Sequence, residues 1–322
     1  MPHSRFRLSV LSVIIAAAPL GAAYAAYPDR PITFVVPFAA GSATDQIGRA
    51  IGQGITESTG QTVIIENRPG ASAMIGAQTV ARAKNDGYTI LITTNTTHAA
   101  NEHLYKQLSY DPVKDFAPIS LLGKGGQIMV VNPQSPARTV QEFIEQARKS
   151  PGQLSFGSGS SSSRIAGELL KQMAGIDLLH VPYKSNPLAV TDLLGGQISM
   201  MITDAATGLP QVNAGKLRAL GVTGTARSPL APDVPTIAEA GVPNYEMGYW
   251  FAAYAPAGTD PAVVLRLNAL MAEAMKSKPA QQFYSQTGTV AEASTPEALG
   301  TFQKAESEKW GKIIQAAGIQ PE

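Results

Sequence analysis

The chain has 322 residues, of which 44% are hydrophobic and 15% are charged, and its formal net charge is +1. This composition is typical of a globular protein long enough for two domains, and the near-neutral charge argues against a nucleic-acid partner. The absence of cysteine excludes disulfides, thiol catalysis, cysteine metal sites and the acylated cysteine of a lipoprotein.

The N-terminus has the pattern of a secretory signal. Arg5 and Arg7 precede an apolar run at 8–20, and residues 23–25 (Ala-Tyr-Ala) form a small-residue cleavage site. The apolar run is shorter than the roughly 20 residues needed to span a bilayer. The sequence therefore predicts a signal peptide at residues 1–25 and a mature protein that diffuses freely in the periplasm.

Strand and helix patterns alternate along the mature chain. We expect strands at 32–36, 62–66, 88–93, 128–131, 154–156, 198–203 and 249–254. We expect helices at 45–58, after Thr139 and Ser163, and from Asp260-Pro261 and Thr295-Pro296. In the first helix, Ile47, Ile51 and Ile55 share one face. This βαβ alternation predicts an α/β protein with parallel sheets flanked by helices.

Turn-rich segments at 123–126 and 228–243 separate two strand and helix series. We therefore expect a two-lobed fold in which the chain leaves the first lobe and later returns to it. The predicted first lobe comprises residues 26–125 and 248–322, and the second comprises residues 126–247. Two crossing segments would then form a hinge.

Two strand, small-polar loop, helix units stand out, one at 32–45 and the other at 154–164. Each places backbone N–H groups and hydroxyls at the start of a helix, where they can hold an anion. Because the two units fall in different predicted lobes, they indicate a cleft that closes on a negatively charged small molecule. Hydroxyls of Thr44 and Ser163 could instead serve as helix caps.

The candidate ligand-binding residues follow from these loops and from the ends of neighbouring strands. They are Phe38, Ala40, Gly41, Ser42, Thr44, Thr94, Asn95, Ser158, Gly159, Ser160, Ser161, Ser162, Ser163, Arg164 and Asp204.

Some of these candidates and a few neighbouring residues have specific expected roles. The Arg164 guanidinium could take a second carboxyl group bidentately, which favours a dicarboxylate ligand. Asp204 could accept a ligand hydroxyl or lock the hinge, and Asp45 is expected to orient the first loop. Trp250 and Phe251 could stack on an aromatic ligand or pack in the core.

Enzyme functions find little support in the residues. The serine-rich loop lacks the G-x-S-x-G pattern of a secreted hydrolase. His98 and His103 are not accompanied by a zinc-binding motif. No dinucleotide or phosphate-binding glycine motif occurs, so we predict no catalytic residue, metal or cofactor.

Motifs spread over the whole mature chain resemble the tripartite tricarboxylate transporter receptors, also called the Bug family. They are Tyr27-Pro-Asp-Arg-Pro-Ile32, Pro37-Phe38 with Gly41 and Thr44-Asp45, Asn67-Arg-Pro-Gly-Ala71, Asp86-Gly-Tyr88, His180-Val-Pro-Tyr-Lys184, Asp192-Leu-Leu-Gly-Gly196 and Asp233-Val-Pro-Thr236.

The resemblance implies a periplasmic binding protein of the type II, Venus-flytrap kind, which holds a carboxylate between the two loops. It also implies a monomer that hands ligand to membrane permease subunits, or alternatively one that presents ligand to a sensor kinase. Ala39-Ala40-Gly41-Ser42 and Arg164 depart from the usual family pattern. Candidate ligands are citrate-like tricarboxylates, aliphatic dicarboxylates and aromatic dicarboxylates such as terephthalate.

Overall fold

A computed structural model describes residues 27–321, so the predicted signal peptide at 1–25 lies outside the described residues. The strands are β1 (Ile32–Val36), β2 (Val63–Asn67), β3 (Thr89–Thr94), β4 (Phe116–Val131), β5 (Ser155–Ser158), β6 (Leu179–Pro182), β7 (Met200–Asp204), β8 (Arg218–Val222) and β9 (Gly248–Pro256). The helices are α1 (Ala43–Thr59), α2 (Met74–Ala81), the π-helix η1 (Thr96–Ala100), α3 (Asn101–Leu104), α4 (Val140–Lys149), α5 (Ser161–Ala174), α6 (Asn186–Leu194), α7 (Ala205–Asn213), α8 (Pro261–Ala274), α9 (Lys278–Thr287) and α10 (Pro296–Ala316).

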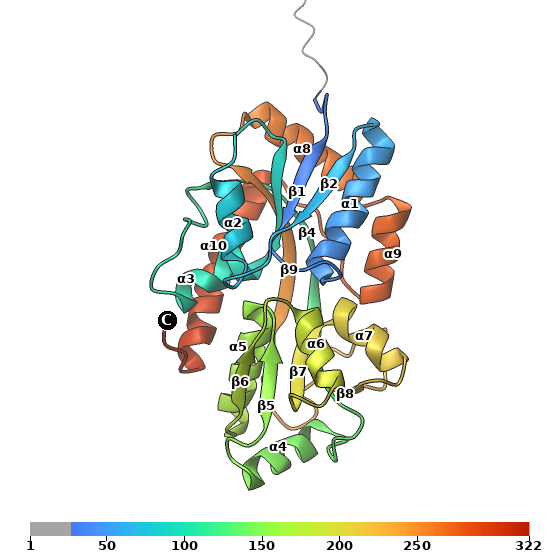
Figure 1. Ribbon diagram of the computed structural model, residues 1–322, viewed down its shortest axis with the longest axis vertical. Helices are drawn as coiled ribbons and strands as arrows, with labels where there is room; N and C mark the ends of the chain where they lie inside the picture. The colour runs from blue at the N-terminus through green and yellow to red at the C-terminus, as the bar shows by residue number, and fades with distance from the viewer. Residues whose placement is uncertain (1–26, 322) are drawn as a thin grey trace, which may run out of the picture.

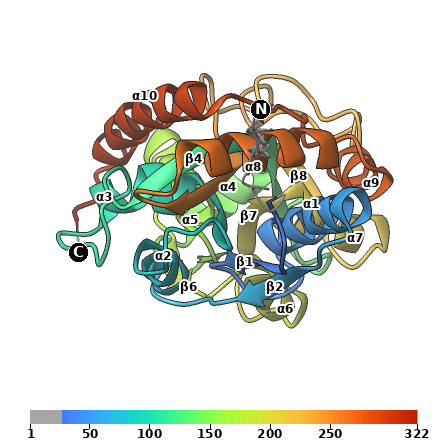
Figure 2. The ribbon, with the colours of Figure 1, turned by 90° about the horizontal axis from the view of Figure 1, so that it is seen from above.

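The described chain forms two lobes stacked along the long axis of the molecule (Figure 1). Helices α1, α2, α8 and α9 surround the first lobe, and α4 to α7 surround the second. Seen from above, α8 and α10 lie along one side of the molecule, with β2 and α6 on the opposite side (Figure 2). The predicted two-lobed α/β fold is confirmed. Within residues 27–321, no helix has the length and apolar character needed to cross a membrane.

Strand order along the sheet is β2-β1-β3-β9-β4-β7-β5-β6, and β8 pairs with β4. The βαβ parts are parallel as predicted, with β1 between β2 and β3 and with β5 between β6 and β7. The two central strands differ from this expectation, because β4 and β9 run antiparallel to their neighbours. A chain that crosses between lobes and later returns supplies two strands of opposite direction.

The crossing point in β4 is sharply defined by its hydrogen-bonding partners. Up to Gly126 the strand pairs with β9, where Gly126 lies opposite Gly248. From Gln127 onward it pairs with β7, and Gln127 lies opposite Asp204. Gly125, Gly126 and Gly248 meet at this point, and glycine accepts a wider range of backbone angles than other residues.

The predicted apolar faces form the cores of the lobes. Ile47, Ile51 and Ile55 of α1 are fully buried and pack with Phe34 of β1. Each such buried side chain contributes about 1.5–3 kcal/mol relative to an exposed one. In α10, Trp310 and its neighbours on the same face are buried, and Gly318 lies just past the helix with a φ of 67°. The isoleucine and tryptophan faces therefore fix α1 and α10 against the sheet.

Candidate functional site

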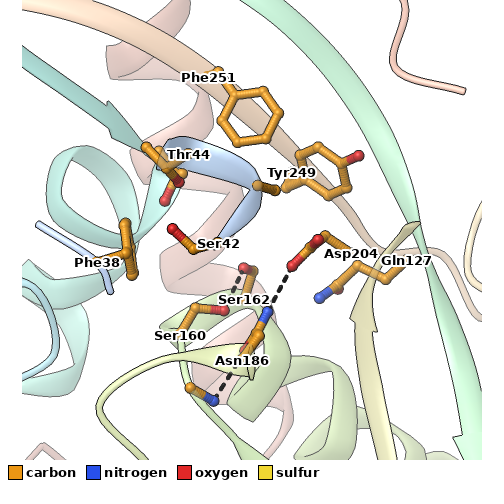
Figure 3. Close-up of a pocket in the computed structure, with 13 residues that line it drawn as sticks. Phe38, Ser42, Thr44, Gln127, Ser160, Ser162, Asn186, Asp204, Tyr249 and Phe251 are labelled. Carbon is orange, nitrogen blue, oxygen red and sulfur yellow. Dashed lines mark hydrogen bonds between the residues drawn. The ribbon is translucent and has the colours of Figure 1, made fainter. Parts of the chain in front are cut away.

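A pocket of about 380 Å³ lies where the parallel strands of both lobes end. Strands β1, β3, β5 and β7 all lead into it, and the crossing strands β4 and β9 close it at the hinge. The lining residues, most of them labelled in Figure 3, are Phe38, Ser42, Ala43, Thr44, Thr94, Gln127, Gly159, Ser160, Ser162, Asn186, Asp204, Tyr249 and Phe251.

Three helices, α1, α5 and α7, begin at this pocket. Ser42 caps α1 by accepting a hydrogen bond from the Asp45 N–H at 3.3 Å. Ser160 caps α5 by accepting from the Ser163 N–H at 3.2 Å. Asp204 caps α7 by accepting from the Thr207 N–H at 2.8 Å. The positive ends of the α1 and α5 dipoles therefore converge from the two lobes, which favours a bound anion, whereas the α7 end already faces the Asp204 carboxylate.

The serine loop of the second lobe is held in place by Asn186, at the start of α6. The Gly159 N–H donates to Asn186 Oδ1 at 3.0 Å, and Asn186 Nδ2 donates to Asp204 Oδ2 at 2.8 Å. Ser160 Oγ and Ser162 Oγ lie 3.1 Å apart. This network preorganises the hydroxyls, so a ligand does not have to order the loop on binding.

The hinge side of the pocket is aromatic. Tyr249 and Phe251 of β9 line it, whereas Trp250 points to the opposite face of the strand, as the two-residue period of a strand requires. Trp250 Nε1 donates to Glu306 Oε2 at 3.1 Å, and its ring packs on Phe302. Of the two aromatics considered for stacking on a ligand, only Phe251 faces the pocket. Burial and, secondarily, the nearby Asp204 carboxylate raise the pKa of Tyr249, which stays neutral.

The structure brings eight of the predicted residues to the pocket. They are Phe38, Ser42, Thr44, Thr94, Gly159, Ser160, Ser162 and Asp204. The other predicted residues do not line it. They are Ala40, Gly41, Asn95, Ser158, Ser161, Ser163 and Arg164. A ligand-binding role for any of these residues stays a prediction.

Several residues outside the lining make contacts that hold the loops. Ser161 Oγ donates to Asn101 Oδ1 at 2.8 Å, which joins the two lobes. Ser163 Oγ donates to the Ile202 carbonyl, and Ser158 Oγ lies 2.7 Å from His180 Nε2. The Gly41 N–H donates to Asp45 Oδ2 at 2.9 Å. These hydroxyl and amide groups therefore hold the loops and join the lobes, and whether they also contact a ligand stays a prediction.

Arg164 lies in a neighbouring pocket of about 500 Å³, together with Tyr105 and Tyr183. The two pockets share Gly159 and Ser160. Ser162 and Arg164 are two positions apart on α5, about 200° around the helix, so they face different sides. Arg164 therefore does not line the serine pocket, and its pairing with a second carboxyl group of the ligand stays a prediction.

Four lining residues were absent from the sequence prediction. Ala43 and Tyr249 lie next to or near predicted residues, but Gln127 and Asn186 come from segments with no binding motif. Ligand sites in α/β proteins lie at the carboxyl ends of parallel strands. This tendency could have predicted Asn186 only if its loop were known to face β5. Gln127 is placed by the crossing of β4 between lobes, which has no local sequence signal.

Asp45 orients the first loop, as expected from its place in the first turn of α1. Its carboxylate accepts hydrogen bonds from the Gly41 N–H, from Asn67 Nδ2 at 2.9 Å and from Arg49 Nε at 3.0 Å. Burial alone would raise the pKa of Asp45, but the hydrogen bonds from Arg49, Gly41 and Asn67 outweigh it and lower the pKa. The charged form is therefore the one that holds the loop.

Replacing Asp45 with Ala should lower the free energy of unfolding by about 1–3 kcal/mol, because the Gly41 and Asn67 donors lose their acceptor. Urea denaturation at neutral pH measures the loss. Glu57→Ala is the matched control, since Glu57 is an exposed acid at the far end of the same helix. An equal, small effect of both substitutions would contradict the role of Asp45.

The described residues contain no group of three His, Asp or Glu side chains that could hold a metal ion. Residues 47–319 match the family model of the tripartite tricarboxylate transporter family receptor. The chain belongs to this family. Its members are solute receptors and not enzymes, and the resemblance seen in the sequence motifs is confirmed.

Relatives of known sequence or structure agree with the family match. Protein BugT of Bordetella pertussis is 33% identical over 318 residues, which covers 97% of this chain and 98% of BugT. Rpa4515 of R. palustris, solved with adipate, superposes with a TM-score of 0.89 at 35% identity and covers 92% of this chain and 100% of its own. MatC of Rhodopseudomonas palustris, solved with malate, superposes with a TM-score of 0.85 at 30% identity. The match covers 89% of this chain and 100% of MatC.

Proposed function

We propose that this receptor captures a small dicarboxylate in the periplasm and delivers it to the permease subunits of a tripartite tricarboxylate-type transporter. The observation that carries the proposal is the convergence of hydroxyls from both lobes on one pocket. Ser42 and Thr44 approach from the first lobe, and Ser160 and Ser162 approach from the second. The adipate and malate held by the two structural relatives support a dicarboxylate ligand.

The proposed mechanism is closure of the lobes around the ligand. Residues 26–125 with 248–322 form one moving unit and residues 126–247 form the other, with the hinge in β4 and β9. A carboxylate that bridges Ser42 and Ser160 makes its full set of contacts only when the lobes are closed. Binding therefore shifts the equilibrium toward the closed monomer, which the permease recognises.

The carbon skeleton of the ligand is assigned to the aromatic wall of the pocket. Phe38, Tyr249 and Phe251 present apolar surface to it, and the last two also pack on one another at 5.0 Å between ring centroids. Such a wall accepts an aliphatic chain or the flat ring of an aromatic diacid such as terephthalate. Chain length and planarity of the acid are therefore the variables to screen first.

A thermal-shift screen of ligand-stripped protein against mono-, di- and tricarboxylates tests the proposal. An acid at about 100 times its Kd adds about 2.7 kcal/mol to the stability of the native state and should raise the unfolding midpoint by several degrees. A selective rise with one class of dicarboxylate is the expected result. An unchanged midpoint with every carboxylate would overturn the proposal.

Thr44→Val should weaken carboxylate binding about 10- to 100-fold, because a hydrogen bond to a charged group contributes about 1.5–3 kcal/mol. The Thr44 hydroxyl has no hydrogen-bond partner within residues 27–321, so the substitution should leave stability nearly unchanged. Calorimetric titration measures the Kd. Thr301→Val, on the exposed face of α10, is the control. Equal Kd values for Thr44→Val and wild type would remove Thr44 from the site.

A further inference from the structure

The two ends of the pocket differ in chemistry. Ser42, Thr44, Ser160 and Ser162 provide hydroxyl groups that can donate to an anion. Asp204 and Gln127 lie together at the hinge end, on the side away from Phe38 (Figure 3). They are directly opposite residues of β7 and β4, so their side chains leave the sheet as neighbours.

Gln127 is buried, and its side-chain oxygen lacks a hydrogen-bond donor in the part of the chain that the structure describes. The residue is only 2% exposed, and Gln127 Oε1 has no hydrogen-bond partner within residues 27–321. Its backbone is fully engaged, since the Gln127 N–H donates to Thr223 Oγ1 at 2.8 Å and its carbonyl accepts from the Thr223 N–H at 2.9 Å. A buried amide oxygen without a donor is costly. Figure 3 draws the Gln127 amide nitrogen on the pocket side, so the oxygen meets a donor on a ligand once the amide is turned over.

Asp204 gives this end of the pocket its charge. Asp204 is 8% exposed, and its carboxylate accepts hydrogen bonds from two neutral donors, the Thr207 N–H and Asn186 Nδ2. No cation forms an ion pair with it among the described residues. A ligand carboxylate placed against Asp204 would be repelled at short range, whereas a hydroxyl or an ammonium group would be attracted.

We infer that Asp204 and Gln127 form a subsite for a hydrogen-bond donor on the ligand, either a hydroxyl or an ammonium group. This inference rests on the proposed function, because it assumes that a carboxylate occupies the serine end. It narrows the ligand class to carboxylates that carry a donor on the carbon skeleton. A dicarboxylate fits when its donor faces Asp204 and its second carboxylate points elsewhere.

The position of the subsite also ties ligand chemistry to the hinge. Gln127 is the first residue of β4 that pairs with the second lobe, immediately after Gly126. A donor shared by Asp204 and Gln127 holds β7 against β4 at this crossing point. Acids without the donor should therefore bind more weakly even when they fill the serine end completely.

Matched acids with the same carbon skeleton test the inference by calorimetric titration of the mature protein. Succinate is compared with malate and aspartate, and butyrate with 4-hydroxybutyrate and 4-aminobutyrate. We expect at least one donor-bearing acid to bind tenfold or more tightly than its donor-free parent. If donor-free and donor-bearing acids bind equally, the inference is wrong and the carboxylate receptor function stands. If none of the acids in the two sets and in the wider carboxylate screen binds, both are overturned.

Two variants test whether Asp204 and Gln127 cause the preference for donor-bearing acids. Asp204→Asn keeps an N-cap side chain for α7 but removes the charge, and should reduce the preference for an ammonium at least tenfold. Gln127→Met removes the amide at similar length, and should reduce the preference for a hydroxyl three- to tenfold. Asp177→Asn is the control, because Asp177 is exposed in the same lobe. Circular dichroism confirms folding. If both variants fold and keep the wild-type preference for donor-bearing acids, Asp204 and Gln127 do not form the subsite. If a variant fails to fold, the comparison of acids with wild-type protein decides the inference.

Discussion

Gly159→Ala should abolish tight carboxylate binding and strongly destabilise the protein. A Cβ atom at this position would lie 1.9 Å from the Ser185 carbonyl carbon and 2.1 Å from the Asn186 nitrogen. Both contacts are with backbone, so no side-chain rotation relieves them. The loop would have to move, which breaks the hydrogen bond from the Gly159 N–H to Asn186 Oδ1.

The expected magnitude follows from the contacts that move with the loop. Overpacking of this kind costs about 1–3 kcal/mol of stability. Displacing Ser160 and Ser162 removes two hydrogen bonds to a charged ligand. The loss of binding free energy is at least about 3 kcal/mol, which corresponds to at least a hundredfold rise in Kd. Urea denaturation and calorimetric titration with the best acid from the screen measure the two effects.

Gly300→Ala is the matched control. Gly300 lies inside α10, and the nearest atom to an added Cβ is Pro118 Cγ at 3.8 Å, an ordinary contact. Because alanine is the better helix former, this substitution should stabilise the protein by up to about 1 kcal/mol and leave binding unchanged. Wild-type affinity in folded Gly159→Ala would show that the Gly159 loop does not hold the ligand.

The second large effect is a loss of stability in acid caused by His98. The ring is fully buried, stacks on Tyr254 at 3.9 Å between centroids and meets Phe116 edge-on. Thr97 Oγ1 lies 2.8 Å from His98 Nδ1, and His98 Nε2 has no partner within residues 27–321. Burial lowers the pKa of His98 from 6.5 to about 3.

The direction of the pH dependence follows from the lowered pKa of the folded state. Above pH 6.5 His98 is neutral in both states, so its burial carries no ionisation penalty. Below pH 6.5 His98 is protonated in the unfolded chain but stays neutral in the folded chain. The free energy of unfolding therefore decreases until the pH reaches about 3. Between pH 6.5 and 4.5 the loss is roughly 2 kcal/mol.

Urea denaturation at a series of pH values measures this contribution. His98→Phe keeps an aromatic ring in the stack but cannot ionise, so its stability should fall less steeply than that of wild type over this window. Asp45 adds its own loss at lower pH, because its lowered pKa favours the folded state only while the carboxylate is charged. The same pH slope in His98→Phe and wild type would exclude His98 as the source.

Local sequence patterns predicted the elements that are determined locally. Hydroxyls before a helix predicted N-caps in both loops, but the caps are Ser42 and Ser160 and not Thr44 and Ser163, because each helix begins two or three residues earlier than the sequence suggested. The four-residue spacing of Ile47, Ile51 and Ile55 predicted the buried face of α1. The alternation of strands and helices predicted the parallel parts of both sheets. The family motifs spread along the chain predicted the two-lobed fold.

Contacts between distant segments could not be predicted in the same way. Asn186 holds the Gly159 loop from α6, and Gln127 reaches the pocket only because β4 crosses from one sheet to the other at that residue. Neither position is marked by a motif. Pairing between distant strands depends on the whole packing of the chain, which no short window of sequence contains.

The sequence by itself determined that two helices start in small-polar loops rich in hydroxyls and N–H groups, because capping and dipole depend on residues within one turn. Only the tertiary structure decided which side chains of those turns share a pocket. Ser162 faces the cleft and Arg164 a neighbouring pocket, although they are two residues apart. The physical reason is that the docking angle of α5 on its sheet sets which helix face meets the other lobe.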